Sequence, residues 1–299
     1  AGGIPILKSI KEGLAANKIE WVAGIINGTT NFILTEMREK GITFAEALSE
    51  AQSLGFAESD PTFDIEGIDA AHKLTILAGL SFGIPMSFKD VYVEGITALE
   101  QKDIQYADEL GYRIKLLGIA KKRDKGIELR VHPTLIPEKR LIANVNGVMN
   151  AVVVKGNMIG PTLYYGAGAG ALPTASSVVA DLIDISRSSH VPPHGFEDNK
   201  IDKIPIYKID DAISGYYLRI RVSDKPGVLA EITKLFGDKK ISIDAMLQKE
   251  PKEYESEADI VILSHLAVEK DINVVIHSIE SLSATIGNVI KIRLEELSK

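Results

Sequence analysis

The sequence predicts an α/β protein of the α+β kind, with a mixed, largely antiparallel sheet followed by a smaller βαββαβ module. Two observations carry this prediction. Between residues 113 and 165, segments rich in Val, Ile, Leu and Tyr alternate with turn residues, the pattern of antiparallel strands. From residue 217 to 294, the apolar pattern indicates strand, helix, strand, strand, helix and strand. We therefore expect a first domain over residues 1–187 with helices on one face of its sheet, a linker over residues 188–214, and a ferredoxin-like module over residues 215–299.

Composition narrows the classes of function. The 299 residues include 45% apolar side chains, and 41 acidic residues are interspersed with 34 basic ones, giving a net charge of −7. Such a chain has no cationic surface for nucleic acid or anionic lipid, so we expect a small soluble ligand, no nucleic-acid partner and no membrane association. The absence of cysteine excludes a thiol nucleophile and a zinc–thiolate site, and it fits a cytoplasmic location.

The first eighty residues show strong local signals for helices. Residues 6–17 place three apolar side chains on one helical stripe, and residues 19–26 have the pattern of a strand. Asn27 is positioned to cap a helix that ends near Gly41. Thr43 and Glu46 form a capping box for the next helix, which stops at Gly55. Residues 68–80 are apolar on nearly every side after the first turn, which predicts a helix buried inside the domain.

Glycines mark two later boundaries. Gly166, Gly168 and Gly170 form a turn that leads through a Pro-Thr pair into a predicted helix over residues 175–185. The backbone amides of this turn are candidates for contact with a phosphate, and a plain flexible turn is the alternative. In the second module, the predicted helix over residues 226–236 has an apolar stripe and ends at Gly237.

The most informative short element is Asp69-Ala70-Ala71-His72-Lys73. The i to i+4 spacing places the carboxylate and the ammonium on one helix face, in the favourable order. A surface ion pair is the ordinary interpretation of this spacing. Because the helix is apolar beyond Lys73, we expect the ammonium to be partly desolvated, which moves a lysine toward acid–base function.

A cluster of carboxylates precedes this helix. Residues 58–69 contain five acidic side chains, which suits a substrate that carries an ammonium group. The alternative is that some of them only complement the positive end of the helix dipole. Their spacing does not match a calcium loop, and His190 and His194 enclose two prolines that forbid helical ligation, so we expect no metal site made of side chains.

Five ordered blocks resemble the signatures of homoserine dehydrogenases. They are Gly2-Gly3-Ile4-Pro5-Ile6, the stretch Gly24 to Asn31, Ala57-Glu58-x-Asp60-Pro61-Thr62-x-Asp64, Gly67-x-Asp69-Ala70-Ala71-x-Lys73, and the stretch Gly166 to Ser176. The segment Asp224-Lys225-Pro226-Gly227-Val228-Leu229 similarly resembles an ACT domain, a βαββαβ module that binds amino acids in regulated biosynthetic enzymes.

The resemblance implies NAD- or NADP-dependent interconversion of L-aspartate 4-semialdehyde and L-homoserine, in threonine and methionine biosynthesis. It implies that Lys73 exchanges the proton at the reacting oxygen, and that Asp69 and Glu58 hold the substrate amino group or a water. Asp64 would support that network, and Gly28 and Thr29 would border the substrate. Gly166, Gly168 and Gly170 are the corresponding cofactor-binding candidates, and the main-chain carbonyls of Gly2 and Ile4 are candidates for a monovalent cation, Na⁺ or K⁺.

The family pattern also includes a Rossmann-type nucleotide-binding half before the first block, which this sequence lacks. With no initiator Met either, we expect a truncated or processed chain that is inactive by itself. The resemblance implies a homodimer or higher homo-oligomer, and it places the glycine turn and the following helix against the nucleotide-binding half. The alternatives are an amino-acid-binding regulatory fragment without activity, and an enzyme that uses Lys73 as a Schiff-base nucleophile.

The last expectation concerns an effector in the second module, for which the resemblance suggests L-threonine. Asp224 is placed to cap the helix that follows, and Gly227 allows the amides near Val228 and Leu229 to face a carboxylate. Asp244, on the adjacent predicted strand, is expected to accept from the ligand ammonium. A dimerising module that binds no ligand is the alternative.

Overall fold

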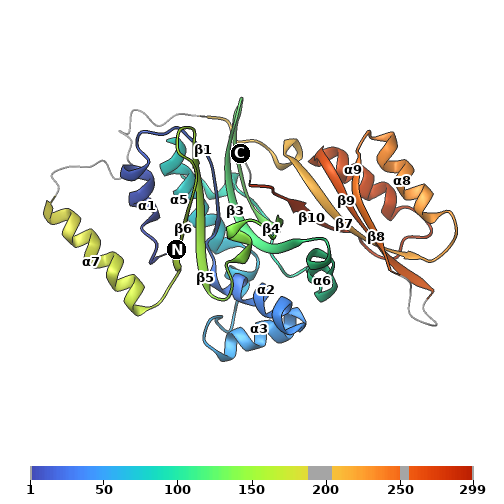
Figure 1. Cartoon of the computed structure of the whole chain (residues 1–299), viewed down its shortest axis with the longest axis horizontal. Coiled ribbons are helices and arrows are strands. Elements are labelled where there is room, and N and C mark those ends of the chain that lie inside the picture. Colours follow the sequence, from blue (N-terminus) through green and yellow to red (C-terminus); the bar gives the residue numbers. More distant parts are fainter. Residues whose placement is uncertain (1, 188–203, 250–255, 298–299) are drawn as a thin grey trace.

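A single sheet runs through the described part of the chain. The computed structural model describes residues 2–187, 204–249 and 256–297. The strand order is β6-β5-β1-β3-β4-β10-β7-β9-β8, with the short β2 also paired to β4 (Figure 1). The first-domain strands are β1 Ile19–Ile25, β2 Tyr92–Val93, β3 Tyr112–Arg123, β4 Gly126–Pro137, β5 Met149–Gly156 and β6 Gly160–Ala167. Apart from the parallel pairing of β2 with β4, the strand pairs within this domain are antiparallel, as the sequence predicts.

The helices of the first domain gather on one face of this sheet. They are α1 Ile6–Lys8, continued by a π-helical turn Ser9–Gly13, α2 Gly28–Lys40, α3 Phe44–Ser53, α4 Thr62–Ile65, α5 Ile68–Phe82 and α6 Gln101–Glu109. Alternate strand residues such as Val22, Leu116 and Val152 pack against them in the main core. The intervening residues, such as Trp21 and Leu117, form a smaller core under the turn Leu141–Asn144.

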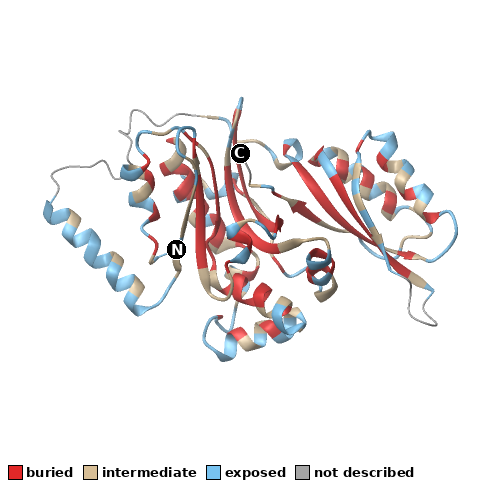
Figure 2. Cartoon of the chain, in the orientation of Figure 1, coloured by how far each residue is buried: buried red, intermediate tan, exposed pale blue. Residues whose placement is uncertain are grey.

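Local sequence signals fix the ends of three of these helices. The Asn27 side chain accepts from the Thr30 amide at the start of α2, and Gly41 ends the helix with φ 67°. Thr43 and Glu46 form the predicted capping box of α3. Helix α5 departs from its prediction, because His72 and Ile76 are exposed, although most of its other residues from Ala70 to Leu80 are buried. Figure 2 shows the buried residues concentrated on the strands of the sheet, with α7 almost entirely exposed.

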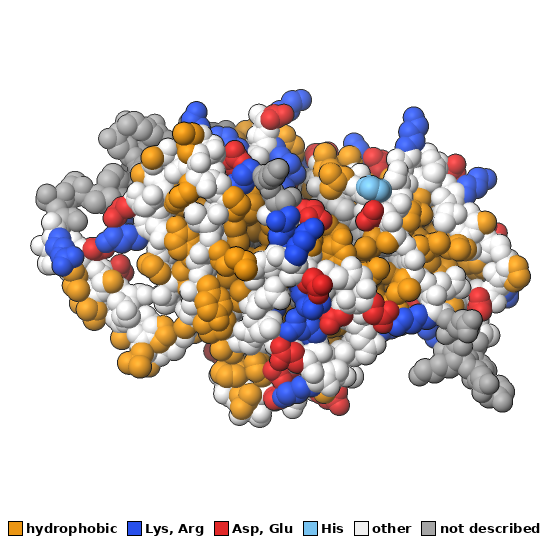
Figure 3. Space-filling view, viewed as in Figure 1, with side chains coloured by type: hydrophobic (Ala, Val, Ile, Leu, Met, Phe, Trp, Pro, Cys, Tyr) orange, Lys and Arg blue, Asp and Glu red, His pale blue; other side chains and the backbone are white. Residues whose placement is uncertain are grey.

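Helix α7, Ala171–Arg187, begins four residues earlier than predicted, because the first turn of a helix tolerates Pro173. None of its residues is buried. Apolar side chains along it, including Leu172, Leu182 and Ile185, remain exposed (Figure 3). Polar contacts, Ser177 to Gly2 and Asp184 to Lys8, link α7 to the N-terminal residues, and the described residues leave these apolar side chains uncovered.

The C-terminal module has the predicted βαββαβ order. Its elements are β7 Ile213–Ser223, α8 Val228–Asp238, β8 Ile243–Gln248, β9 Glu257–Val268, α9 Glu269–Glu280 and β10 Ile290–Leu294. Both helices pack on one face, where Ile232, Phe236 and Ile272 lie in the core. The prediction that Gly237 ends the first helix is wrong, since α8 continues to Asp238 and the left-handed residue is Lys240 with φ 56°.

The proposed linker is partly visible. Within its described portion, Ile206 bridges to Ile127 of β4, and β7 begins at Ile213, two residues before the predicted boundary. The remainder of the linker, including His190 and His194, lies outside the described residues.

Pairing between β10 and β4 joins the two predicted sheets. Arg293 and Leu294 of β10 lie parallel to Thr134 and Leu135 of β4. In the part of the chain that the structure describes, no helix combines the length and apolar character needed to cross a membrane.

Buried ion pairs reinforce this junction. Arg219 of β7 donates to the Asp103 carboxylate of α6 at 2.6 and 3.0 Å, and Tyr217 donates to the same carboxylate at 2.9 Å. Arg293 of β10 is fully buried and donates to Glu94 at 2.7 Å and to Glu269 at 2.8 Å. Across the junction, the Arg219–Asp103 pair is buried on both sides, whereas Arg293 is buried and its partner Glu94 is 31% exposed. A buried pair of this kind tolerates loss of one partner poorly.

Candidate active site

Lys73 and Asp69 lie together on α5, as their spacing predicts. The Lys73 Nζ is 2.6 Å from Asp69 Oδ2 and donates to the main-chain oxygen of Ile26 at 3.2 Å. Ile26 immediately follows β1, so the ammonium sits where the end of a central strand meets the helix. The pair is a short, charge-assisted hydrogen bond that fixes the position of the ammonium.

Asn27 connects this pair to a second carboxylate. Its Nδ2 donates to Asp69 Oδ2 at 2.8 Å and to Asp64 Oδ1 at 2.6 Å, while its Oδ1 caps α2. Asn27 is 5% exposed, so its amide is fully used inside the protein. The sequence predicted Asn27 only as a helix cap, because its contacts to Asp64 and Asp69 depend on a tertiary approach of three elements.

These residues surround a cavity of about 440 Å³. Its lining consists of Asn27, Gly28, Thr29, Gly55, Phe56, Asp64, Asp69, Lys73, Val148, Asn150 and the segment from Ala167 to Gly170. The structure therefore brings together most of the predicted catalytic, substrate and cofactor residues in one cavity. Asn150, Val148 and Phe56 are additions that carried no recognisable signal in the sequence.

The charged residues differ in how far they are buried. The Lys73 side chain is 41% exposed and its contacts are partly buried, which agrees with the predicted partial desolvation of its ammonium. Glu58 is exposed and does not line the cavity. Asp69, at 19% exposure, is the better shielded member of the ion pair.

The positive end of α2 also opens on the cavity. Gly28 and Thr29 are the first helical residues, and both line the cavity. The Thr29 hydroxyl is occupied, since it donates to the main-chain oxygen of Phe56 at 2.7 Å. Backbone amides at this end, rather than the Thr29 hydroxyl, are therefore the donors available to an anionic group.

The glycine turn forms another part of the wall. Gly168 and Gly170 line the cavity, whereas Gly166 does not and instead packs near Ile4. The N-terminal block lies against this turn, because the amide of Gly2 donates to the Gly168 oxygen at 2.7 Å. Among the cation candidates, the Gly2 oxygen accepts from Ser177 at 2.5 Å and the Ile4 oxygen accepts from the Ile6 amide at 2.7 Å. Each carbonyl retains a second lone pair.

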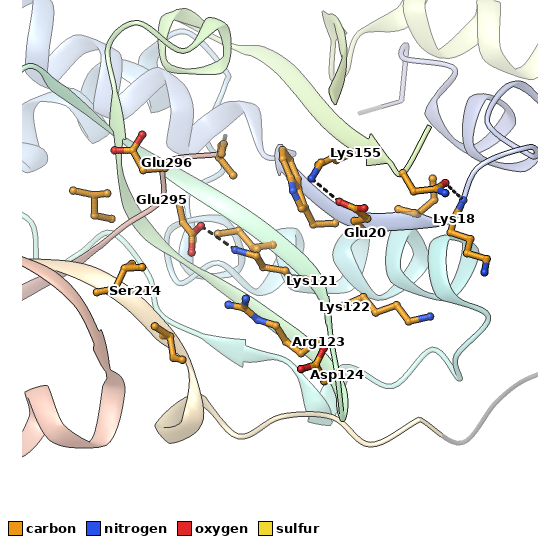
Figure 4. A pocket seen from close by; sticks show the side chains of 18 residues that line it. Lys18, Glu20, Lys121, Lys122, Arg123, Asp124, Lys155, Ser214, Glu295 and Glu296 are labelled. Carbon is orange, nitrogen blue, oxygen red and sulfur yellow. Dashed lines mark hydrogen bonds and ion pairs between the residues drawn. The ribbon is translucent and has the colours of Figure 1, made fainter. Parts of the chain in front are cut away.

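Side-chain metal sites are not found in the described ranges, where no three His, Cys, Asp or Glu residues gather in a way that would hold an ion. A larger cavity of about 960 Å³ lies elsewhere, and charged side chains such as Glu20, Lys121 and Lys155 line it (Figure 4). Two of its four lysines are engaged locally, in the pairs Lys155–Glu20 and Lys121–Glu295. None of the predicted site residues lines it.

The predicted effector site is only partly assembled. Helix α8 is capped by the backbone of Gly227, φ 96°, and no side chain caps it, so the expected capping role of Asp224 is wrong. Asp244 is also misplaced. Its neighbour Ile243 in β8 pairs with Ser264 of β9, which pairs with Tyr216 near the start of β7. Helix α8 instead follows the end of β7 at Ser223, which pairs with Glu257 at the opposite end of β9. The β8 strand therefore starts far from the α8 N-terminus, where Val228 and Leu229 lie.

Comparison with known proteins identifies the class and then the family. A family model described as homoserine dehydrogenase matches residues 5–183, and one described as ACT domain matches residues 216–284. The chain is thus an oxidoreductase of amino-acid biosynthesis that carries an ACT domain. It belongs to the homoserine dehydrogenase family.

Individual relatives agree over the whole chain. The homoserine dehydrogenase of Pseudomonas aeruginosa is 55% identical over all of this chain and 70% of its own length. That of Neisseria gonorrhoeae is 57% identical over 99% of the chain and 69% of its own length. A crystal structure of a homoserine dehydrogenase from Thiobacillus denitrificans has a TM-score of 0.94 and 59% identity, and the match covers 100% of this chain and 69% of that one. These matches do not favour the regulatory-fragment interpretation.

The family also indicates the cofactor class. Homoserine dehydrogenases use NAD or NADP. A hyperthermophilic archaeal homoserine dehydrogenase mutant solved in complex with NADPH matches 62% of this chain with 31% identity and a TM-score of 0.53.

Proposed function

We propose that the 440 Å³ cavity is where L-homoserine and L-aspartate 4-semialdehyde are interconverted, with Lys73 exchanging the proton at the reacting oxygen. The observation that carries this proposal is the 2.6 Å contact between Lys73 and Asp69 at the edge of the cavity. When bound, NAD(P)H supplies the hydride to the aldehyde carbon. The Lys73 ammonium donates a proton to the aldehyde oxygen, and the oxygen becomes the homoserine hydroxyl.

The remaining residues orient the substrate around this proton. Asp69 accepts from the Lys73 ammonium, and the Asn27 amide donates to both Asp69 and Asp64. Asp64 and Asp69 attract the substrate ammonium, while the amides of Gly28 and Thr29 suit its carboxylate. Glu58, which is exposed and outside the cavity lining, is proposed to help hold the substrate ammonium or a bound water.

The glycine turn is proposed to border the cofactor. A Cβ at Gly168 would lie 2.0 Å from Asn150 Oδ1, so at this point the cavity wall is bare backbone. A flat aromatic ring can approach bare backbone closely, and the residues present therefore fit a nicotinamide. Gly170, which lines the same wall, and Gly166, which leads into it, complete the proposed cofactor contact.

Oxidation of L-homoserine with NAD or NADP, measured with the full-length protein, tests this function. We expect absorbance at the reduced-cofactor wavelength to rise with L-homoserine and to remain flat with L-serine, which is one carbon shorter. Equal activity on both substrates, or activity on neither, contradicts the proposal. Borohydride trapping of substrate on Lys73 would instead support the Schiff-base alternative.

A monovalent cation is proposed at the carbonyls of Gly2 and Ile4. Both belong to the block that lies against the glycine turn, so an ion there would stiffen the cavity wall. We expect Na⁺ or K⁺ to raise the melting temperature above that in an equal concentration of tetramethylammonium. The same melting temperature in all three salts contradicts the site.

L-Threonine is the proposed effector, bound at the α8 N-terminus by the amides near Val228 and Leu229. Calorimetry with L-threonine, and with isoleucine, methionine and lysine for comparison, tests this site. Gly227→Val is expected to abolish the heat of L-threonine binding, because a β-branched residue is strained at φ 96° and would move the backbone amides that follow it. Asp244→Asn, at the other end of the sheet, is the control and should leave the heat of binding unchanged. Heat from none of these amino acids leaves a structural role for the module.

We further propose that the protein is a cytoplasmic homodimer or higher homo-oligomer. We also propose that a nucleotide-binding half covers the apolar side of α7, because the side chains of Leu172, Leu182 and Ile185 are exposed. Analytical ultracentrifugation of the full-length protein is expected to give a mass at least twice that of the monomer. A single monomeric species at micromolar concentration contradicts the oligomer.

A further inference from the structure

Asn150 is a buried amide to which the proposed mechanism gives no role. It lies in β5 at 1% exposure and lines the 440 Å³ cavity. Its Nδ2 is buried and has no hydrogen-bond acceptor among the described residues. An unpaired buried donor costs about 1–3 kcal/mol, and native proteins leave few of them. An acceptor on a bound ligand would remove this cost.

The glycine turn is built around this amide. Asn150 pairs with Gly166 in the ladder between β5 and β6. At Gly168, any Cβ would lie 2.0 Å from the Asn150 Oδ1 and 2.5 Å from its Cγ. No other residue type therefore fits at Gly168 while the amide keeps its position. The amide and the bare backbone of Gly168 form one continuous part of the wall.

The charge distribution around the cavity indicates which acceptor this donor meets. The charged lining residues are Asp64, Asp69 and Lys73, and all three belong to α4 and α5. The residues that β5 and the glycine turn contribute carry no charge. The charged groups of the substrate match the part of the wall formed by α4 and α5 and the backbone amides at the start of α2. A neutral amide donor beside bare backbone matches a neutral, planar carbonyl compound.

We propose that Asn150 donates a hydrogen bond to the carbonyl oxygen of the nicotinamide carboxamide and so orients the ring against Gly168. This proposal rests on the proposed hydride-transfer function. It makes Asn150 a cofactor-positioning residue, and it gives a physical reason for glycine at Gly168. The ring then lies on the uncharged part of the wall, with the substrate on the charged part.

Asn150→Leu is the informative variant, because leucine has a similar size and branching but no donor. NADPH binding to the full-length protein is measured by the fluorescence of the nucleotide. We expect Kd to rise roughly 2- to 10-fold, the loss of one neutral hydrogen bond. The melting temperature is expected to stay level or rise, because Asn150 Nδ2 has no acceptor to lose within the described ranges. Asn144→Leu is the control, since it removes donors to Glu138 and Arg140. It should lower the melting temperature and leave Kd unchanged.

A cofactor analogue with an amino group in place of the carboxamide completes the test. The unmodified protein should bind this analogue more weakly than NADPH, whereas Asn150→Leu should bind both alike. Unchanged NADPH binding in Asn150→Leu overturns the proposal, as does an increase in KM for homoserine alone, which would assign Asn150 to the substrate. Failure of the unmodified protein to oxidise homoserine is a separate result and counts against the proposed function.

Discussion

At the scale of single residues, the site depends on how carboxylates and amides share a few hydrogen bonds. Asp69 accepts from both Lys73 and Asn27, so one carboxylate fixes the ammonium and the end of α2. The sequence revealed Asp69 and Lys73 because both lie on one helix. It could not reveal Asn27 and Asn150 as site residues, because their partners come from other elements.

Asp69→Asn is expected to lower kcat/KM for homoserine about 10- to 100-fold, through loss of a charge-assisted hydrogen bond worth about 1.5–3 kcal/mol. Glu58→Gln is expected to have a smaller effect, confined to KM, because Glu58 lies outside the cavity. Steady-state kinetics of both variants, with the exposed Asp90→Asn as the control, provide the measurement. If neither variant changes kcat/KM, these acids serve only as helix-end charges.

Lys115 gives stability a predictable dependence on pH. Lys115 is 2% exposed, and its ammonium donates to the Val145 oxygen at 2.6 Å, without an ion-pair partner among the described residues. Burial lowers the pKa of Lys115 from 10.5 to about 7. Between these values the folded state holds fewer protons than the unfolded state, so the free energy of unfolding rises with pH from about 7 toward 10.5.

Urea unfolding at pH 6.5 and pH 9 tests this dependence. Lys115→Met is expected to remove this contribution, so that its stability increases less with pH than that of the unmodified protein. The exposed Lys122→Met is the control and should behave like the unmodified protein. An identical pH response in Lys115→Met and the unmodified protein would show that Lys115 is fully solvated.

At the scale of elements, helix ends were the most predictable features. The cap at Asn27, the capping box of Thr43 and Glu46, and the stop at Gly41 each involve residues within four positions of one another. The start of α7 was predicted late, because a proline is compatible with either side of a helix start. The exposed edge of α5 was missed, because a sequence does not show whether an apolar helix residue faces the core, a cavity or the surface.

Asn27→Ala tests the link between a cap and the site. Loss of an N-cap costs about 0.5–2 kcal/mol of stability. Thr43→Ala should cost a similar amount at α3, away from the cavity. We expect both variants to unfold at lower urea, but only Asn27→Ala to lower kcat/KM, because it alone releases Asp64 and Asp69. Equal activity in the two variants would contradict this link.

At the scale of the whole molecule, the continuous sheet was not predictable. The order of the C-terminal elements follows from local periodicity, but the pairing of Arg293 with Thr134 joins residues far apart in the sequence. The position of Asp244 was wrong for the same reason, because strand order and register decide which strand ends meet. Buried arginines such as Arg219 likewise find their partners only in the assembled fold.

Arg219→Met is expected to destabilise the protein by about 3–5 kcal/mol, because it leaves the Asp103 carboxylate buried without its cation. Combining it with Asp103→Leu should restore much of the loss. Arg140→Met, at a pair with Glu296 that is 31% and 51% exposed, should cost less than about 1 kcal/mol. Chemical unfolding of these three variants and the unmodified protein provides the comparison. A small effect of Arg219→Met alone would mean that water reaches this junction.

The central claim is that Lys73 exchanges the proton in homoserine oxidation, and the rate of Lys73→Ala tests it most directly. General acid–base catalysis contributes about 10²–10⁴-fold to rate, so kcat should fall by that factor while the melting temperature stays within a few degrees. Lys89→Ala, an exposed lysine that does not line the cavity, is the matched control and should keep full activity. A folded Lys73→Ala protein with near-normal kcat would contradict the account.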